Sequence, residues 1–199
     1  LVYGGRLDDY SDFDRQFSPR LGLLHTTDDQ AVLKILYGHA YRAPNLSEMF
    51  GSEQLQPNFD LQAEEMDSLE LVYQKQTRHW VSTLTLFQNW WSEWIRGAPL
   101  EVPSDDFLFQ FRNTGRNEAY GVEAETQARW EQARLSLAAS YVRSENVDSG
   151  EVFSAFPEWM LDLGWGYRFS AQWDVYINNR LLLRDAASAP VIPGDPIET

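Results

Sequence analysis

The 199-residue sequence contains no cysteine. Disulfide bonds, thiolate-bound metals and cysteine nucleophiles are therefore excluded together. The three histidines, His25, His39 and His79, lie too far apart in the sequence to give a metal-ligand spacing. The sequence also lacks a phosphate-binding loop, a dinucleotide-binding fingerprint and a nucleophile elbow. We therefore expect no cofactor, no metal site, no catalytic residue and no enzymatic activity.

Basic residues are scarce, and long apolar runs are missing. The chain has 16 Lys and Arg against 30 Asp and Glu, which gives a formal net charge of −14. No basic stripe is present to neutralise phosphates, so nucleic acid is not an expected partner. The mean hydropathy is −0.45, and no run approaches the ~18 apolar residues of a membrane-spanning helix. Spanning strands are not excluded, because they alternate apolar and polar residues.

Aromatic residues, by contrast, are abundant and fall in segments with a period of two. Phe, Trp and Tyr make up 14% of the chain, with eight Trp. Apolar–polar alternation is typical of strands with one polar face. We expect an all-β antiparallel meander of about ten strands. These strands are expected at 1–7, 17–25, 31–42, 67–76, 80–95, 107–113, 119–130, 134–144, 159–170 and 173–184.

Short and long connections alternate along this meander. The short ones are 26–30, 77–79, 131–133 and 170–172, and the long ones are 8–17, 43–66, 97–106, 145–157 and the segment after 185. Outer-membrane barrels show this asymmetry, with short periplasmic turns and longer extracellular loops. A soluble sandwich has no reason to place every short turn at one end. The pattern therefore favours part of a transmembrane β-barrel.

Two strands carry aromatic residues at both ends of an apolar face. Tyr120 and Trp130 lie ten residues apart, as do Trp159 and Phe169. With the tilt of barrel strands, ten residues span about 24 Å along the barrel axis, close to the ~25 Å apolar band of these barrels. A soluble sheet with one wet face also alternates, but it would not repeat large aromatics at both ends. The predicted lipid-facing girdle is Tyr120, Trp130, Trp159, Trp165, Tyr167 and Phe169.

Two segments resemble sequence motifs of a known family. Residues 37–48 read Tyr-Gly-His-Ala-Tyr-Arg-Ala-Pro-Asn-Leu-Ser-Glu, and residues 113–123 read Asn-Thr-Gly-Arg-Asn-Glu-Ala-Tyr-Gly-Val-Glu. Together with 56–64 and 67–73, they resemble barrel segments of TonB-dependent outer-membrane receptors. The resemblance extends from about Gly5 to about Arg184. Tyr41 replaces the usual Phe of these receptors, and Gln62-Ala-Glu64 replaces their Lys-Pro-Glu.

The resemblance implies that residues 1–199 are a partial barrel domain, the late-middle part of a barrel of about 22 strands in the bacterial outer membrane. The plug domain, the TonB box and the C-terminal strands of the family are not in the sequence. The implied function of the parent protein is TonB-energised uptake of a scarce nutrient. The nutrient is most often a ferric siderophore, otherwise cobalamin, haem or a saccharide. The implied partners are the nutrient, the TonB complex through an N-terminal segment, and outer-membrane lipid.

Candidate ligand-facing residues lie where strands run into long loops. Arg42 could contact a ligand, but an ion pair with Glu48 that anchors the loop is the favoured interpretation. Trp90, Trp91 and Trp94 are expected in an aromatic belt, with a ligand-stacking surface as the alternative. The glycines of 113–123 are expected at a bend or bulge. The full set of candidate loop residues is Arg42, Glu48, Trp94, Arg96, Arg112 and Arg116.

One alternative from another class stays open. A soluble, aromatic-rich β-protein acting as a surface adhesin or a carbohydrate-binding module would show much of the same alternation. An outer-membrane barrel hydrolase is a further alternative, but no Ser/His/Asp arrangement supports it. The exposure of the apolar face distinguishes the barrel from the soluble protein.

Overall fold

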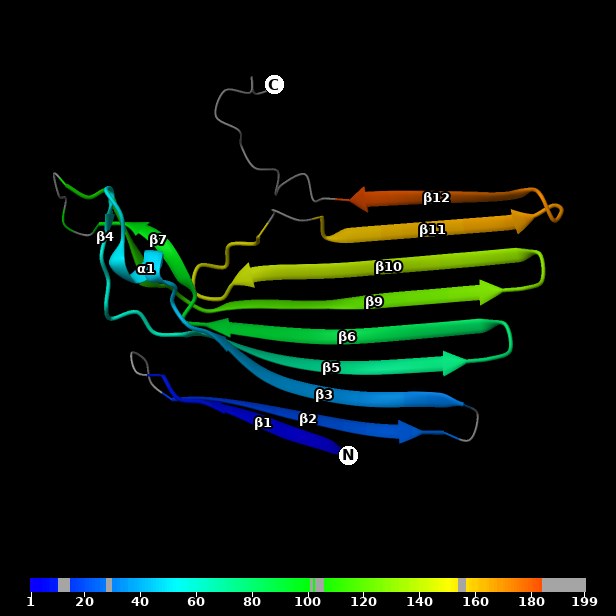
Figure 1. The fold of residues 1–199 in the computed structure, drawn as a ribbon, viewed down its shortest axis with the longest axis horizontal. Coiled ribbons are helices and arrows are strands. Elements are labelled where there is room, and N and C mark those ends of the chain that lie inside the picture. Colours follow the sequence, from blue (N-terminus) through cyan, green and yellow to red (C-terminus); the bar gives the residue numbers. More distant parts are fainter. Residues whose placement is uncertain (11–14, 28–29, 101, 103–105, 154–156, 184–199) are drawn as a thin grey trace, which may run out of the picture.

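In the computed structural model of the chain, nine strands form one antiparallel sheet (Figure 1). The structure describes residues 1–10, 15–27, 30–100, 102, 106–153 and 157–183. Each strand of the sheet pairs with the sheet strands before and after it in the chain, so the sheet is the predicted meander. In spatial order its strands are β1 (Val2–Asp8), β2 (Gln16–Thr26), β3 (Ala31–Arg42), β5 (Glu64–Gln76), β6 (Trp80–Ser92), β9 (Asn117–Arg129), β10 (Ala133–Asn146), β11 (Trp159–Arg168) and β12 (Asp174–Leu183).

Two long insertions at one end of the sheet fold against each other. The insertion after β3 contains the helix α1 (Leu46–Phe50) and the strand β4 (Leu55–Gln56). The insertion after β6 contains β7 (Ile95–Pro99) and β8 (Phe109–Asn113). β8 pairs with β4 in parallel and with β7 antiparallel, which gives a separate three-stranded sheet.

This small sheet corrects two of the predicted strands. The strand expected at 107–113 is not part of the wall, because β8 lies in the loop sheet. The strand expected at 80–95 ends at Ser92, and Glu93 then adopts a positive φ of 54°. Ile95 starts the next strand in a different sheet. Within the described residues the wall therefore has nine strands rather than about ten.

The predicted asymmetry of the connections is confirmed. The turns β2–β3, β5–β6, β9–β10 and β11–β12 all lie at the right-hand end in Figure 1. The insertions that contain α1 and the loop sheet lie at the opposite end. We call these the short-turn end and the loop end.

The strand register divides the sheet into an apolar and a polar face. Residues that pair directly across antiparallel strands lie on the same face. Val122 pairs with Leu86 on one side and Tyr141 on the other. The polar neighbour Glu123 pairs with Thr85 and Ser140 on the opposite face. The alternation seen in each strand is thus continuous across the sheet.

The sheet has almost no core of its own. Among the described residues no large side chain is fully buried, and Leu84, Leu137 and Leu163 on the apolar face are each more than 40% exposed. A soluble β-sandwich would cover this face with a second layer. The exposed apolar face therefore favours a lipid-facing wall over the soluble alternative. No helix among the described residues is long and apolar enough to cross a membrane.

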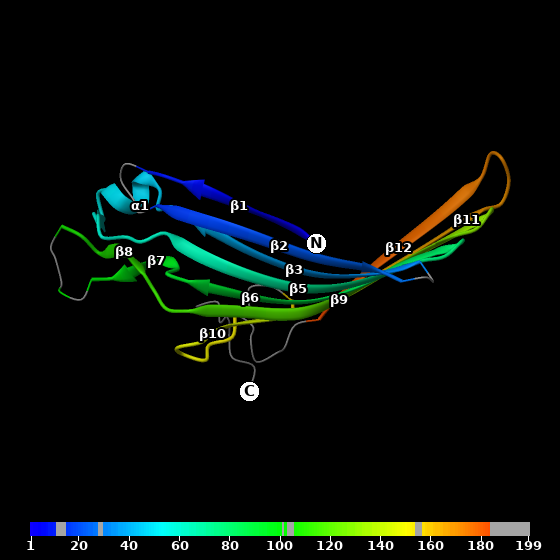
Figure 2. The same ribbon diagram turned by 90° about the horizontal axis from the view of Figure 1, so that it is seen from below.

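The sheet is curved and twisted, as Figure 2 shows from below. Curvature of this kind is required when a sheet forms part of a barrel wall. β1 and β12 are the two outermost strands, and each is paired on one side only.

Glycine is required at two positions of the 113–123 segment for different structural reasons. Gly115 has a positive φ of 55° and lies in the bend that returns the chain to the wall, as predicted. Gly121 is not in a bulge, because it pairs regularly with Phe87 and Val142. A Cβ at Gly121 would contact the carbonyl oxygen of Tyr141 and lie 2.6 Å from the Phe87 ring. The glycine therefore makes room for that ring.

Candidate functional site

Arg42 joins the end of β3 to two segments that follow it. Its Nη1 and Nη2 donate to the two carboxylate oxygens of Glu48 at 3.0 and 3.1 Å, and its Nε donates to Oε2 of Glu64 at 2.6 Å. The other oxygen of Glu64 accepts from the backbone N–H of Ile95 at 2.8 Å. We call Arg42, Glu48 and Glu64 the rim clasp. It ties β3, α1, β5 and β7 together.

Glu48 also caps the helix that carries it. Asn45 is the N-cap of α1, and its Oδ1 accepts from the N–H of Glu48 at 3.0 Å. Glu48 in return accepts from the backbone N–H of Asn45 at 2.8 Å, which completes a capping box. The ion pair between Arg42 and Glu48 that the sequence favours is present, and its geometry is that of a loop anchor.

The rim clasp lies beyond the predicted aromatic girdle, toward the loop end. Leu69 of β5 pairs with Gln88 of β6, which pairs with Tyr120 of β9, so Leu69 and Tyr120 lie at the same height in the sheet. Glu64 precedes Leu69 by five residues and therefore lies about 12 Å farther than Tyr120 toward the loop end, measured along the barrel axis. Burial acts to raise the pKa of Glu64, but the hydrogen bonds from Arg42 and Ile95 outweigh it and hold that pKa below its ordinary value. The hydrogen bond to Glu64 likewise raises the pKa of Arg42.

An apolar cleft of about 430 Å³ opens beside the clasp on the polar face of the sheet. Trp94 and Phe153 meet there edge to face, with ring centroids 5.6 Å apart. The guanidinium of Arg96 lies 4.8 Å from the Trp94 ring centre, within cation–π distance. We call this space the outer cleft, and it is lined by Glu64, Trp91, Trp94, Asn117, Val142, Ser144, Phe153 and Pro157.

Asn117 brings a hydrogen-bonding group to this apolar lining. Its side chain is buried, with a residue exposure of 4%, and its Oδ1 accepts from Asn146 at 3.1 Å. Its Nδ2 has no hydrogen-bond partner among the described residues. Buried amide groups without a partner are costly, so an acceptor that reached this group would lower that cost.

The three tryptophans of 90–94 do not form one belt, which corrects the favoured expectation. Trp90 lies on the apolar face and is 42% exposed. Trp91 pairs with Asn117 on the opposite face, and both Trp91 and Trp94 line the outer cleft. The geometry of Trp91 and Trp94 is therefore that of the alternative interpretation, a stacking surface.

The predicted loop arginines fall into three groups. Arg42 belongs to the rim clasp. Arg96 and Arg112 pair directly across β7 and β8, and Nε of Arg112 donates to Gln110 at 3.0 Å. Arg116 lies elsewhere, where its Nη2 and its backbone N–H both donate to Asp148 at 3.1 and 2.9 Å. The four arginines do not converge on one point.

The predicted girdle residues share one face of the sheet. Trp159 stacks at a tilt on Tyr141, with 4.7 Å between ring centroids, at the loop end. Trp130 lies at the short-turn end, edge to face with Trp80 at 5.4 Å. The other predicted girdle residues lie on the same face: Tyr120, Trp165, Tyr167 and Phe169.

The sequence did not single out Glu64, Asn117 or Phe153 as site residues. Glu64 and Asn117 open β5 and β9, and Phe153 lies in the connection between β10 and β11. They come together only through the strand pairing. For Glu64 and Asn117, the sequence signal that could have indicated a site is a polar residue where a strand begins after a predicted long loop. Among the described residues no group of His, Asp and Glu could hold a metal ion.

Comparison with known proteins agrees with this architecture. Residues 1–193 match the family model described as TonB dependent receptor-like, beta-barrel. A curated relative, the ferric enterobactin receptor PirA of Pseudomonas aeruginosa, is 28% identical over 186 residues, which cover 81% of this chain and 25% of that protein. The chain therefore spans a quarter of the length of this relative.

Solved structures show the same fold at lower identity. The siderophore receptor PirA of Acinetobacter baumannii has a TM-score of 0.76 at 22% identity, over 89% of this chain and 30% of that one. A mutant of the ferric enterobactin receptor PfeA of Pseudomonas aeruginosa has a TM-score of 0.77 at 22% identity, over 89% and 29%. The wall described above is thus a segment of an outer-membrane β-barrel, and the chain belongs to the family of TonB dependent receptor-like β-barrels.

Proposed function

We propose that the full-length protein is an outer-membrane receptor that takes up a ferric siderophore with energy supplied by TonB. Residues 1–199 are in this proposal a partial barrel domain, which supplies wall strands and extracellular loops. The plug domain and the C-terminal strands belong to the remaining part of the protein, and the N-terminal segment contacts the TonB complex. The chain itself carries no catalytic chemistry in this proposal.

The outer cleft is the observation that carries the proposal. In a barrel the polar face lines the interior, so the cleft opens inward at the extracellular end. Aromatic rings from Trp91, Trp94 and Phe153 offer stacking surface, Asn117 brings an amide to the lining, and the guanidinium of Arg96 places a positive charge over the Trp94 ring. Such a site suits a flat, oxygen-rich, anionic ligand. A relative named as a ferric enterobactin receptor supports this ligand class.

Uptake of radiolabelled ferric enterobactin into iron-starved cells tests the proposal. The cells carry the full-length receptor as their single route for this chelate. Energised cells should accumulate iron, and cells without TonB should bind the chelate without accumulating it. Trp94→Ala and Asn117→Ala should each weaken binding about 5- to 100-fold, which corresponds to the loss of a stacking contact or a buried hydrogen bond.

A neighbouring pair of residues provides the matched control. Trp91→Leu removes a ring from the cleft, whereas Trp90→Leu removes the same ring from the apolar face one position away. The first should weaken binding and the second should leave it unchanged. If cells expressing the wild-type receptor neither bind nor accumulate ferric enterobactin or other ferric siderophores, the proposed function is wrong.

A further inference from the structure

The wall opens between β2 and β3 at the loop end. The two strands pair only from Arg20 of β2 and Gly38 of β3 toward the short-turn end. Among the described residues, 16–19 of β2 pair with β1 alone, and 39–42 of β3 pair with β5 alone. Figure 1 shows β3 running away from β1 and β2 toward the loop end. We call the space between 16–19 and 39–42 the seam.

Pro19 gives a physical reason for the end of the pairing. If the register of β2 and β3 continued outward, Pro19 would face His39. Proline has no backbone N–H, so it cannot complete a ladder of hydrogen bonds inside a sheet. Strand edges that lack a neighbouring strand need other hydrogen-bond partners, above all next to a membrane. The seam therefore presents backbone donors and acceptors from both of its sides.

A cavity of about 660 Å³ lies at the seam and is lined by residues of β1, β2 and β3. Small residues keep it open, because Ala40 and Ala43 have short side chains and a Cβ on Gly4 would meet no atom within 4 Å. Tyr10 and Tyr41 meet beside it, with hydroxyl oxygens 2.9 Å apart and rings edge to face at 6.2 Å. The volume is in the range of small-molecule sites.

The lining of this cavity carries two arginines against one carboxylate. Nε of Arg6 donates to Oδ1 of Asp8 at 2.8 Å, so these two charges are paired. The guanidinium of Arg20 has no hydrogen bond or ion pair among the described residues. The whole chain has a net charge of −14, so this positive charge is a local feature. An anion that enters the seam meets Arg20 without a competing carboxylate.

The seam lies at the height of the lipid headgroups. Tyr37 of β3 pairs with Leu69, so Tyr37 is level with Tyr120 of the predicted girdle. His39 and Tyr41 follow two and four residues farther out, which is about 5 and 10 Å along the barrel axis. Headgroups add about 5–8 Å to each side of the hydrocarbon core of a bilayer. The seam thus begins inside the headgroup layer.

The lipid-facing surface continues beside the seam. Leu21 pairs with Tyr37 on the apolar face, and Phe17 lies on the same face four residues farther out. Phe17 pairs with Leu7 of β1, and the two residues are 58% and 62% exposed. Exposed apolar side chains of this size mark a surface that another molecule covers. In the outer membrane the molecule that covers the apolar face of the wall is lipid.

We propose that the seam binds the phosphorylated sugar headgroup of a membrane lipid in the leaflet at the loop end. Arg20 holds the phosphate through charge-assisted hydrogen bonds. The open strand edges exchange hydrogen bonds with the sugar hydroxyls, and the rings of Tyr10 and Tyr41 cover an apolar sugar face. The acyl chains of the lipid run from there along the apolar face. The inference goes beyond siderophore uptake and holds whichever nutrient is carried.

Lipid titration of the delipidated full-length receptor tests this inference. The probe is a lipid with a phosphorylated diglucosamine headgroup, and native mass spectrometry from detergent micelles measures its occupancy. Arg20→Gln should raise the Kd of the tightest site about tenfold or more, because a charge-assisted hydrogen bond is lost. Arg20→Lys keeps the charge and should bind more tightly than Arg20→Gln. Ala40→Trp fills the cavity and should weaken binding about tenfold or more.

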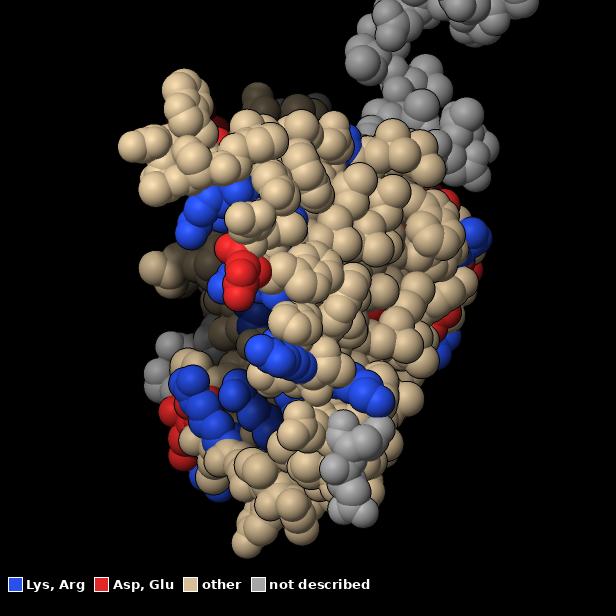
Figure 3. Space-filling model, turned by 90° about the vertical axis from the view of Figure 1, so that its right-hand side faces the viewer, with Lys and Arg blue, Asp and Glu red and all other residues tan. Residues whose placement is uncertain are grey.

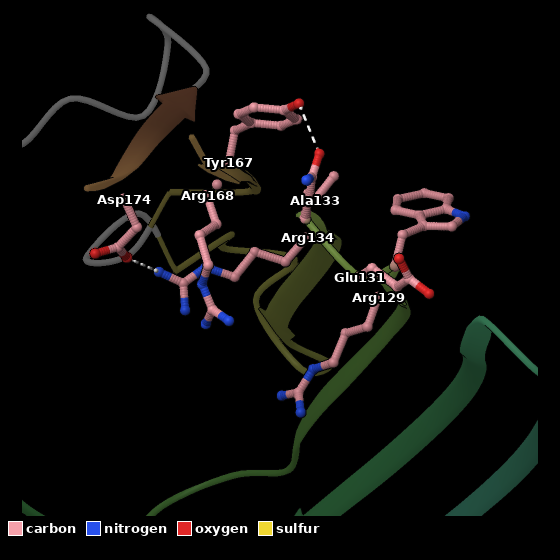
Figure 4. A pocket seen from close by; sticks show the side chains of 10 residues that line it. Arg129, Glu131, Ala133, Arg134, Tyr167, Arg168 and Asp174 are labelled. Atoms are coloured by element: carbon pink, nitrogen blue, oxygen red, sulfur yellow. Dashed lines mark hydrogen bonds and ion pairs between the residues drawn. The ribbon is translucent and has the colours of Figure 1, made fainter. Parts of the chain in front are cut away.

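An arginine at the other end of the wall gives the matched control. Arg168 lines a cavity of about 290 Å³ with Arg134 and Asp174 (Figure 4). Figure 3 looks at this short-turn end and shows Lys and Arg side chains gathered toward one side of it. The guanidinium of Arg168, like that of Arg20, has no hydrogen bond or ion pair among the described residues. Arg168→Gln removes the same charge far from the seam and should leave the Kd unchanged.

The contrary results are equally defined. Equal affinity for phosphatidylglycerol would show that the sugar is not recognised, and equal affinity for soluble glucosamine 1-phosphate would show that the lipid is not. Either result, no binding, or a Kd that Arg20→Gln leaves unchanged would overturn the proposal. If Ala40→Trp fails to fold, Arg20→Gln and Arg20→Lys decide. Intact lipid binding in a receptor that takes up no ferric siderophore would contradict the proposed function alone.

Discussion

At the scale of single residues, carboxylates at the loop end connect neighbouring segments of the chain through hydrogen bonds. Glu48 accepts from Arg42 and from the N-terminus of its own helix, and Glu64 accepts from Arg42 and from the start of β7. Both carboxylates have little exposed side chain, whereas that of Arg42 is 44% exposed. Partial exposure of the arginine limits what the pair contributes, and the hydrogen bonds to backbone N–H groups supply the remaining stabilisation.

Acid should loosen the rim clasp through Glu64. The pKa of Glu64 is lower in the folded than in the unfolded protein, so its contribution is complete above the unfolded pKa of about 4.3 and is lost as pH falls through the folded pKa. Between pH 7 and pH 3.5 the melting temperature of the full-length protein should therefore fall more steeply in the wild type than in Glu64→Gln. Thermal melts in detergent measure this difference. Parallel curves would show that Glu64 titrates with no link to folding.

At the scale of elements, alternation along each strand becomes two continuous faces through antiparallel register. The β9–β10–β11 region shows this most clearly, because Leu137 is flanked by Thr126 and Leu163 and Ser136 by Gln127 and Gly164. Small residues on the polar face make room for larger neighbours. A Cβ at Gly164, for example, would contact the hydroxyl oxygens of Ser136 and Tyr176.

Arginine on the apolar face should destabilise the wall. In the full-length protein folded into lipid vesicles, Val122→Arg or Leu163→Arg should lower the free energy of unfolding by about 2–4 kcal/mol, because a charge near the bilayer midplane is poorly solvated. The control Glu123→Arg places the same residue on the polar face next to Val122 and should cost less than about 1 kcal/mol. Denaturant titration in vesicles measures both. Equal costs on the two faces would contradict the lipid-facing assignment.

At the scale of the whole molecule, the chain is an open sheet. Its outer strands β1 and β12 each leave one row of backbone donors and acceptors unpaired. Its apolar face has no protein layer over it. Both features are expected of a wall segment that lacks the neighbouring strands of its barrel. The relatives are three to four times longer than their matched parts.

Residues 1–199 produced alone in detergent-free buffer should therefore associate. Strand edges pair with other copies and the exposed apolar faces stack, so we expect aggregates or oligomers. Light scattering coupled to size-exclusion chromatography measures the particle mass. A stable, monodisperse monomer with native-like β structure would contradict both the edge argument and the lipid-facing assignment.

Sequence patterns predict the nine wall strands, apart from the end of β6, together with their two faces, the short-turn end and the family resemblance. These depend on local properties, because the pleat repeats every two residues and a motif is contiguous. Alternation along β6 also places Trp90 and Trp91 on opposite faces of the sheet, which is inconsistent with a single aromatic belt. Which distant residues meet depends instead on the three-dimensional fold. The loop sheet and the outer cleft around Asn117 depend on strand register and loop closure across tens of residues, and no local pattern encodes that register.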